Sequence, residues 1–375
     1  MSRTVLIAGG GVGGLEAALA LQSLAGERFD IELLAPERHF TYRPLAVAEP
    51  FGRAATIKVE VARIAADRGF GVTRDALDSV LTEERAVVTH DGCQIAYDDL
   101  VLALGARPRV AVPGALTFRG PQDVARVTKA LHAVETDCHR LRVAFLAPRG
   151  ITWTLPLYEL ALLTKAWAEG RKLAIDISII TPEPFPLAAF GTDAGADVQC
   201  RLDERRIAIR TNCIPETFAD GVVRSVLGAR VPADVAVALP MLVGPNVRGV
   251  PADALGFTPV DDLCRVEGLE RVYAIGDMAA HEIKQGGLAA QQADVAAAAI
   301  AAAAGARPEP YRPVLRGLLF TGGAPLYLRN PPATQETVAA RGGLSAPWWP
   351  PHKIVGRHLA PYLAAHGEML ERAAA

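Results

Sequence analysis

The chain has 375 residues, of which 50% are hydrophobic and 21% charged, with a formal net charge of −2. This length suffices for two domains with their own cores, and the mixed charges give no basic field that would attract nucleic acid. The five cysteines include no C-x-x-C pair and no Cys/His cluster, so the sequence predicts neither a disulfide framework nor a metal site.

An apolar strand near the N-terminus runs directly into a glycine-rich turn. Residues 5–16 read VLIAGGGVGGLE, and a helix-forming pattern continues to Ala25. Gly9 permits a tight turn, Gly11 lets the backbone approach a pyrophosphate, and Gly14 lets the helix pack closely on the strand. This arrangement predicts a dinucleotide site. Its expected contact residues are Gly9, Gly11, Val12, Gly13 and Gly14.

The next segments extend this unit. A strand at residues 31–34 leads to Pro36 and Glu37, and this glutamate stands at about the spacing (~20 residues) of a ribose-binding acid. Further along, Asp91-Gly92 separates two short strand patterns and predicts a hairpin within a β-meander.

Two further apolar strands, at residues 99–104 and 271–275, also end in glycine turns. Their terminal residues are Leu104, Gly105, Gly276 and Asp277. Because the strands of an open parallel sheet gather ligands at their carboxyl ends, we expect these turns to converge on one cofactor. A helix is predicted after Lys284, with Gly287 and Leu288 near its start, and a helix N-terminus stabilises nearby negative charge.

A second unit repeats the outline of the first. Residues 142–147, 156–168 and 177–180 predict strand, helix and strand, and hence a second Rossmann-like half. Its phosphate loop is lost, because Trp153 and two prolines stand where glycines would allow close approach. Glu183 occupies the place of a ribose acid, but it lies between prolines and is better interpreted as a turn residue.

Taken in order, these motifs resemble the FAD-contact motifs of the two-dinucleotide-binding-domain flavoproteins, the pyridine nucleotide-disulfide oxidoreductase superfamily. Over residues 3–305 the chain is most similar to the branch of type II NADH dehydrogenases and sulfide:quinone oxidoreductases. The resemblance implies FAD as the cofactor, with Gly276 and Asp277 at its pyrophosphate and ribityl chain. It also implies that Arg43 and Pro44 pass beside the isoalloxazine.

The expected fold is α/β, with two Rossmann-like domains, a β-meander and a short C-terminal cap. The expected divisions are a discontinuous FAD-binding domain (1–110 and 240–310), a second domain with a degenerate NAD(P) loop (111–239), and a cap (311–375).

The chain departs from this branch in two ways. Trp153 stands where sulfide:quinone oxidoreductases, which resemble the chain at residues 156–159, carry a redox cysteine. Sulfide chemistry through such a thiol is therefore disfavoured, and the alternative left open is that the fold brings Cys138 or Cys200 near the flavin. The lost second loop weakens NADH as the donor.

The C-terminal segment 344–363 shows apolar residues at helical spacing, interrupted by Pro361. We expect it to pack on its own domain, with peripheral membrane contact as the alternative. The alanine-rich stretch 295–304 is about half as long as a spanning helix. The candidates for a catalytic role are Trp153, Lys284 and Trp349.

The sequence thus predicts a cytoplasmic FAD-dependent oxidoreductase that passes two electrons through a non-covalent flavin to a small quinone-like acceptor, with the donor undetermined. Two alternatives stay open: an NAD(P)H-dependent flavin dehydrogenase with an unusual second domain, and a non-catalytic FAD-binding protein. A homodimer and a position at the inner face of the membrane also stay open.

Overall fold

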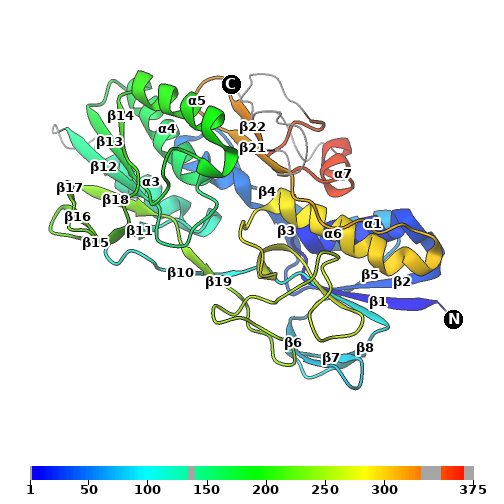
Figure 1. Ribbon diagram of the computed structural model, residues 1–375. Helices are drawn as coiled ribbons and strands as arrows, with labels where there is room; N and C mark the ends of the chain where they lie inside the picture. Colours follow the sequence, from blue (N-terminus) through cyan, green and yellow to red (C-terminus); the bar gives the residue numbers. More distant parts are fainter. Residues whose placement is uncertain (1, 134–139, 331–347, 367–375) are drawn as a thin grey trace.

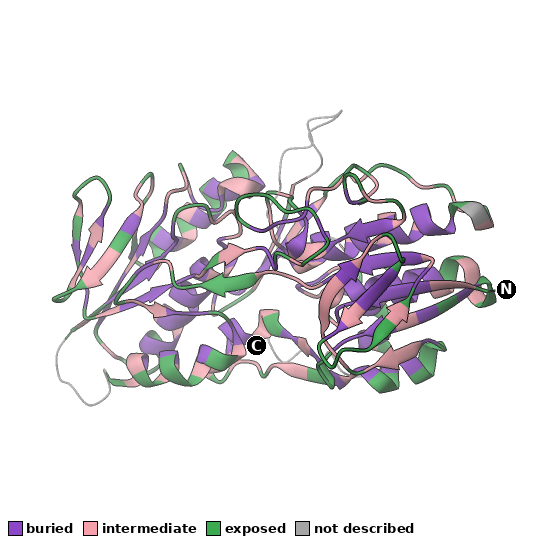
Figure 2. Ribbon diagram, turned by 90° about the horizontal axis from the view of Figure 1, so that it is seen from below, coloured by how far each residue is buried: buried purple, intermediate pink, exposed green. Residues whose placement is uncertain are grey.

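The computed structural model describes residues 2–133, 140–330 and 348–366. Two parallel sheets lie at opposite ends of the molecule, joined by a narrow two-stranded connection (Figure 1). Buried residues run along the strands of both sheets, and exposed residues lie on the outward faces of the helices (Figure 2).

The first sheet has five parallel strands in the order β20-β9-β1-β2-β5. Its strands are β1 (Arg3–Ala8), β2 (Phe29–Leu34), β5 (Gly71–Thr73), β9 (Asp99–Leu102) and β20 (Val272–Ala274). Alternate residues of β1 enter different cores: Val5 and Ile7 face the helices, whereas Leu6 and Ala8 face the β-meander. Both faces of this sheet are covered, which explains why its central strand is a continuous apolar run.

Helices α1 (Val12–Ala25) and α6 (Gly286–Ile300) lie side by side on one face of this sheet (Figure 1). Buried Ala17, Ala293 and Ala297 lie in the same core, and side chains of this size let two helices approach closely. The alanine-rich stretch thus serves helix packing, and none of the described helices is long and apolar enough to cross a membrane. The other face carries the predicted meander, β6 (Leu77–Leu81), β7 (Ala86–Thr89) and β8 (Gln94–Ala96).

The second sheet is also parallel, in the order β11-β18-β12-β13-β14, and confirms a second Rossmann-like half. Its strands are β11 (Leu116–Thr117), β12 (Leu141–Leu146), β13 (Ile175–Ile180), β14 (Ile207–Arg210) and β18 (Val235–Ala238). The helices of this half are α3 (Val124–His132), α4 (Leu155–Gly170) and α5 (Thr192–Glu204). A second meander comprises β15 (Pro215–Ala219), β16 (Val222–Ser225) and β17 (Arg230–Pro232).

The chain crosses between the two sheets through β10 (Arg107–Arg109) and β19 (Met241–Val243), which pair antiparallel. These crossings lie beside residues 110 and 240. They agree with the proposed limits of the second domain at 111–239, and the cap at 311–375 stays a prediction.

The remaining elements lie outside the two sheets and the two meanders. They are β3 (His39–Tyr42), β4 (Ile57–Glu60), α2 (Val61–Arg68), the hairpin β21 (Leu315–Leu319) and β22 (Leu326–Asn330), and α7 (Leu359–Ala365). In Figure 1, α7 lies next to α1.

The C-terminal helix differs from the expectation. Residues 331–347 lie outside the described part of the chain, and Ile354 and Val355 are not helical, so the helix begins only at Leu359. Pro361 does not interrupt it, contrary to prediction. It is the third residue of α7, and the N–H groups of a first turn have no intrahelical partner that a proline could remove.

Candidate functional site

The glycine turn between β1 and α1 is closed on one side and open on the other. A Cβ at Gly9 would lie 2.3 Å from the carbonyl oxygen of Ala103, and one at Gly14 would lie 1.8 Å from that of Gly9. A Cβ at Gly11 would meet no atom within 4 Å. Only glycine fits at the first two positions, and the backbone at Gly11 faces open space. This shape fits a pyrophosphate at the start of α1, where Val12 and Gly13 lie.

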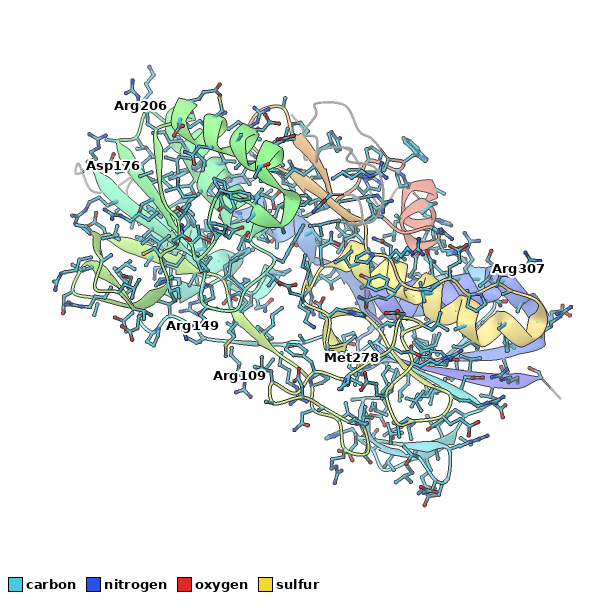
Figure 3. All side chains as sticks on the ribbon, viewed as in Figure 1. Arg109, Arg149, Asp176, Arg206, Met278 and Arg307 are labelled. Carbon is cyan, nitrogen blue, oxygen red and sulfur yellow. The ribbon has the colours of Figure 1, made fainter. Side chains whose placement is uncertain are left out.

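The three glycine-terminated strands end at one edge of the first sheet, because β1, β9 and β20 are parallel neighbours. The Leu104 N–H donates to Sδ of Met278 at 3.4 Å, which joins the turn after β9 to the turn after β20. Met278 is labelled in Figure 3. The Gly276 N–H donates to Oε1 of Gln292 at 2.6 Å, and Gly276 has a φ of 72° that favours glycine. The exposed Pro36 and Glu37 follow β2 at the same edge.

A cavity of about 610 Å³ lies between the two domains. The first domain contributes Arg43, Pro44, Asp277, Lys284 and Gln285 to its wall, and the second domain contributes Phe118, Arg149, Trp153, Leu155 and Glu159. Lys353 and Ile354 of the C-terminal segment complete the lining on one side. Arg43 and Pro44, which are expected beside the isoalloxazine, thus line one cavity together with residues of the second domain and of the C-terminal segment.

Asp277 and Lys284 form an electrostatic pair within this wall. Burial raises the pKa of Asp277, and the charges of Lys284 and Arg43 oppose that rise. Burial lowers the pKa of Lys284 to about 8, against the attraction of Asp277 and Asp253. The Lys284 ammonium lies 3.9 Å from the centroid of the Phe257 ring and donates to the carbonyl oxygen of Ala279. Lys284 is therefore held as a half-buried cation.

Helix α6 begins at Gly286, close to the start predicted after Lys284, and this first residue lies at the cavity. Its first turn is capped by the side chain of the preceding residue, Gln285. The buried Gln285 side chain accepts from the Leu288 N–H at 2.8 Å. The amide of Leu288 is thereby engaged, and of the two preceding glycines Gly286 lines the cavity. The side chain of Ile354 lies against Gly286, because a Cβ there would be 3.0 Å from its Cδ1.

Trp153 lies at the cavity and also contacts the second core. Its ring is tilted against the ring of buried Phe190, with the two centroids 5.8 Å apart. Trp153 is also part of the cavity wall. The neighbouring Thr152 donates to the carbonyl oxygen of Glu282 at 2.7 Å. The loop that lost its phosphate-binding glycines therefore bonds to the first domain beside Lys284.

Glu183 is engaged within its own domain. Its carboxylate accepts hydrogen bonds from the hydroxyls of Thr154 at 2.8 Å, Tyr158 at 2.7 Å and Thr181 at 2.9 Å. The Ala188 N–H adds a fourth bond at 3.2 Å. A carboxylate with this set of partners has little capacity left for ribose hydroxyls.

The sequence reasoning missed a buried ion pair at the cavity. The Lys353 ammonium lies 2.6 Å from both carboxylate oxygens of Glu159 and 4.3 Å from the centroid of the Phe320 ring. The Phe320 N–H also donates to Glu159 at 2.9 Å. Burial raises the pKa of Glu159 and lowers the pKa of Lys353. Glu159 stood in a recognised motif, but nothing in the sequence linked it to Lys353.

Other expected residues are not brought to the cavity. Trp349 is 80% exposed and does not line it. Cys138 lies outside the described residues, and Cys200 is exposed on α5, away from the lining. The described residues contain no cluster of His, Cys, Asp or Glu that could hold a metal ion.

Comparison with known proteins agrees with this geometry. Residues 3–145 match the family model of the pyridine nucleotide-disulphide oxidoreductases. This match covers the first dinucleotide unit and reaches into β12 of the second. The similarity in fold extends over nearly the whole chain. The structure of the sulfide:quinone oxidoreductase from Aquifex aeolicus has a TM-score of 0.83 at 21% identity, over 98% of this chain and 90% of that one.

Two sequence relatives are matched over only part of their length. The ferredoxin–NAD(+) reductase component of the biphenyl dioxygenase system of Paraburkholderia xenovorans is 27% identical over 318 residues, or 76% of this chain and 70% of the relative. The sulfide-quinone reductase of Aquifex aeolicus is 25% identical over 268 residues, or 66% of this chain and 60% of the relative. The match over residues 3–145, these relatives and the fitting cradle together support an FAD-binding oxidoreductase.

Proposed function

We propose that this oxidoreductase passes two electrons from its flavin to a quinone-like acceptor. The observation that carries the proposal is the buried Lys353–Glu159 ion pair, which reaches an otherwise largely apolar cavity wall. Bound FAD supplies the electron transfer between donor and acceptor. The protein must then position the acceptor and supply protons.

We propose that the chain holds FAD through the edge of the first sheet. The open backbone at Gly11 would face the pyrophosphate, and Glu37 would reach the ribose at the end of β2. Asp277 would accept from the ribityl hydroxyls. The amides of Gly286 and Gly287 and the charge of Lys284 would stabilise negative charge on the reduced ring.

The ion pair suits an acceptor that takes up protons with its electrons. A quinone needs two protons for full reduction, and its ring can bury itself against apolar walls. The Lys353 ammonium can donate a hydrogen bond to an acceptor oxygen while Glu159 holds it in place. Because burial brings the pKa values of the two groups closer together, moving a proton within the pair requires less free energy.

The second domain argues against a nicotinamide dinucleotide as the donor. Trp153 and the prolines replace the close-approach glycines, and Glu183 is occupied by three hydroxyls and an amide. A dinucleotide would have to break these bonds before its ribose could bind. We therefore expect NADH and NADPH to bind poorly, and the donor to be another reductant.

An anaerobic half-reaction experiment tests the proposal. The holoprotein is mixed with NADH, NADPH, sulfide or dithionite, and the flavin absorbance is followed. The dithionite-reduced protein is then mixed with a short-chain benzoquinone. We expect slow or no reduction by the nucleotides and rapid reoxidation by the quinone.

Variants Lys353→Met and Glu159→Gln are expected to slow reoxidation at least about tenfold, since one well-placed proton donor contributes about 10²–10⁴-fold to a rate. Lys129→Met, which removes an exposed lysine from α3, is the control. Fast reduction by NADH with micromolar affinity would instead make the protein an NAD(P)H dehydrogenase. A flavin that neither the donors nor the quinone affects would favour the non-catalytic alternative.

A further inference from the structure

We infer that Tyr42 and Glu16 are positioning residues that hold Lys353 at the cavity. They act through one short piece of chain, residues 351–358, here called the strap. The inference rests on the proposed function for its catalytic meaning, because Lys353 is assigned there to the acceptor. The geometry of the strap is independent of that assignment.

The strap crosses from the second domain to the first and is fixed at both ends. At one end Lys353 is paired with Glu159 on α4, as described above. The next residue, Ile354, donates its backbone N–H to the hydroxyl of Tyr42 at 2.8 Å. Tyr42 is buried at the end of β3, immediately before Arg43 and the rest of the segment beside the isoalloxazine. One hydrogen bond therefore fixes the residue next to Lys353 to the cofactor side of the cavity.

The other end of the strap is held by Glu16. This buried residue of α1 accepts from the backbone N–H groups of His358 at 2.9 Å and Leu359 at 2.7 Å. Gly356 lies directly on the same carboxylate, because a Cβ there would be 2.7 Å from one of its oxygens. Glu16 stands two residues beyond the last glycine of the dinucleotide turn.

The two anchors have a consequence for Lys353. A lysine side chain has four rotatable bonds and a large rotamer entropy, and burial disfavours its charge. Its ammonium stays beside Glu159 only if the backbone at residue 353 is fixed. Tyr42 and Glu16 fix that backbone at two points of the strap, and neither of them lines the cavity.

The same anchors connect the acceptor side of the cavity to the cofactor side. Tyr42 belongs to the chain segment of Arg43 and Pro44, and Glu16 belongs to the helix that begins at the glycine turn. Correct placement of Lys353 therefore depends on two segments that also form the FAD site.

The test measures the accessibility of Lys353 directly. FAD-loaded protein is treated briefly with an amine-acetylating reagent at pH 7.5, and acetylation of each lysine is quantified by mass spectrometry. In Tyr42→Phe the Ile354 N–H loses its acceptor, and we expect Lys353 to be acetylated at least about fivefold faster. In Gly356→Ala the added methyl group displaces the strap from Glu16, and the same increase is expected without removal of any polar group.

Tyr362→Phe is the matched control. It removes the hydrogen bond from the Tyr362 hydroxyl to Asp67 at 2.6 Å, which holds α7 but not the strap. We expect unchanged acetylation of Lys353 in this variant. A second readout is the pH dependence of reoxidation by the benzoquinone, which should shift in Tyr42→Phe and Gly356→Ala and not in Tyr362→Phe, whereas a uniformly loosened fold would change all three.

Unchanged acetylation of Lys353 in both folded, FAD-loaded strap variants would overturn the inference, and so would an equal increase in the Tyr362→Phe control. Increased acetylation in a protein that reduces no quinone would retain the positioning role and remove the proposed acceptor. The two failures are thus distinguishable.

Discussion

The Lys353–Glu159 pair makes a quantitative prediction about stability. Glu159→Gln removes the negative partner and leaves a buried ammonium, which typically costs about 3–5 kcal/mol. Lys353 can limit this cost by losing its proton. From an ordinary pKa of 10.5, deprotonation costs about 5 kcal/mol at pH 7 and about 2 kcal/mol at pH 9, at about 1.4 kcal/mol per pH unit.

The sign follows from proton binding. In this variant the unfolded chain holds a proton on Lys353 that the folded chain tends to lose, so stability rises with pH up to the ordinary lysine pKa. The wild type keeps its pair charged and lacks this rise. We therefore expect Glu159→Gln to lose about 3–5 kcal/mol at pH 7, and to recover about 1–3 kcal/mol of it by pH 9, where deprotonation of Lys353 limits the loss to about 2 kcal/mol.

The assay is urea unfolding at saturating FAD, since bound cofactor adds to the apparent stability. The double variant Glu159→Gln/Lys353→Met removes both charges and should recover most of the loss at pH 7, because apolar replacement of a buried pair is often close to neutral. A double variant as unstable as the single one, or a single variant with no pH dependence, would refute the reasoning.

Three further predictions concern other residues. Gly11→Val should abolish FAD retention, because a branched side chain would fill the open space in front of the turn; full flavin occupancy in the purified variant would contradict the assignment. The pKa of Asp294 is raised to about 7 by burial and by Glu16, so this carboxyl lowers stability as pH rises from about 4 to 7. Asp294→Asn should therefore be about 1–3 kcal/mol more stable than wild type at pH 8 and close to it at pH 4.5, as measured by urea unfolding; parallel pH curves would exclude this. Trp153→Ala should change flavin absorbance and fluorescence while the fold survives; a loss of about 3–5 kcal/mol with an unaltered flavin spectrum would assign Trp153 to packing.

The first dinucleotide unit was predictable because its determinants are local. The turn at Gly9 and Gly14 requires glycine for steric reasons that follow from the chain's own backbone, and the strand before it is a short apolar run. The same reasoning located β9 and β20, since a buried strand followed by a glycine turn occupies a few consecutive residues. Parallel pairing then brought their ends to one edge.

The C-terminal segment was less predictable because its structure depends on distant partners. Apolar spacing favoured a helix through Ile354, but the N–H of that residue bonds to Tyr42, 312 positions away, and Lys353 pairs with Glu159, 194 positions away. A periodic pattern indicates which residues are buried, and an irregular strap packed against the two domains can bury them as a helix does. Pro361 was misjudged for a related reason, since its effect depends on where the helix begins.

The second domain shows how a lost binding loop can acquire a structural role. The sequence showed that Trp153 and the prolines cannot cradle a pyrophosphate, and it left Glu183 between two interpretations. In the structure the carboxylate of Glu183 accepts hydrogen bonds from Thr154, at the end of the altered loop, and from Tyr158 in α4. Glu183 therefore holds the altered loop and the helix that follows it. A free ribose-binding acid would need those hydroxyls to point elsewhere. Because Thr154 directly follows Trp153, its bond to Glu183 also helps to fix the wall that Trp153 presents to the cavity, and we expect the donor that reduces the flavin to fit beside that wall.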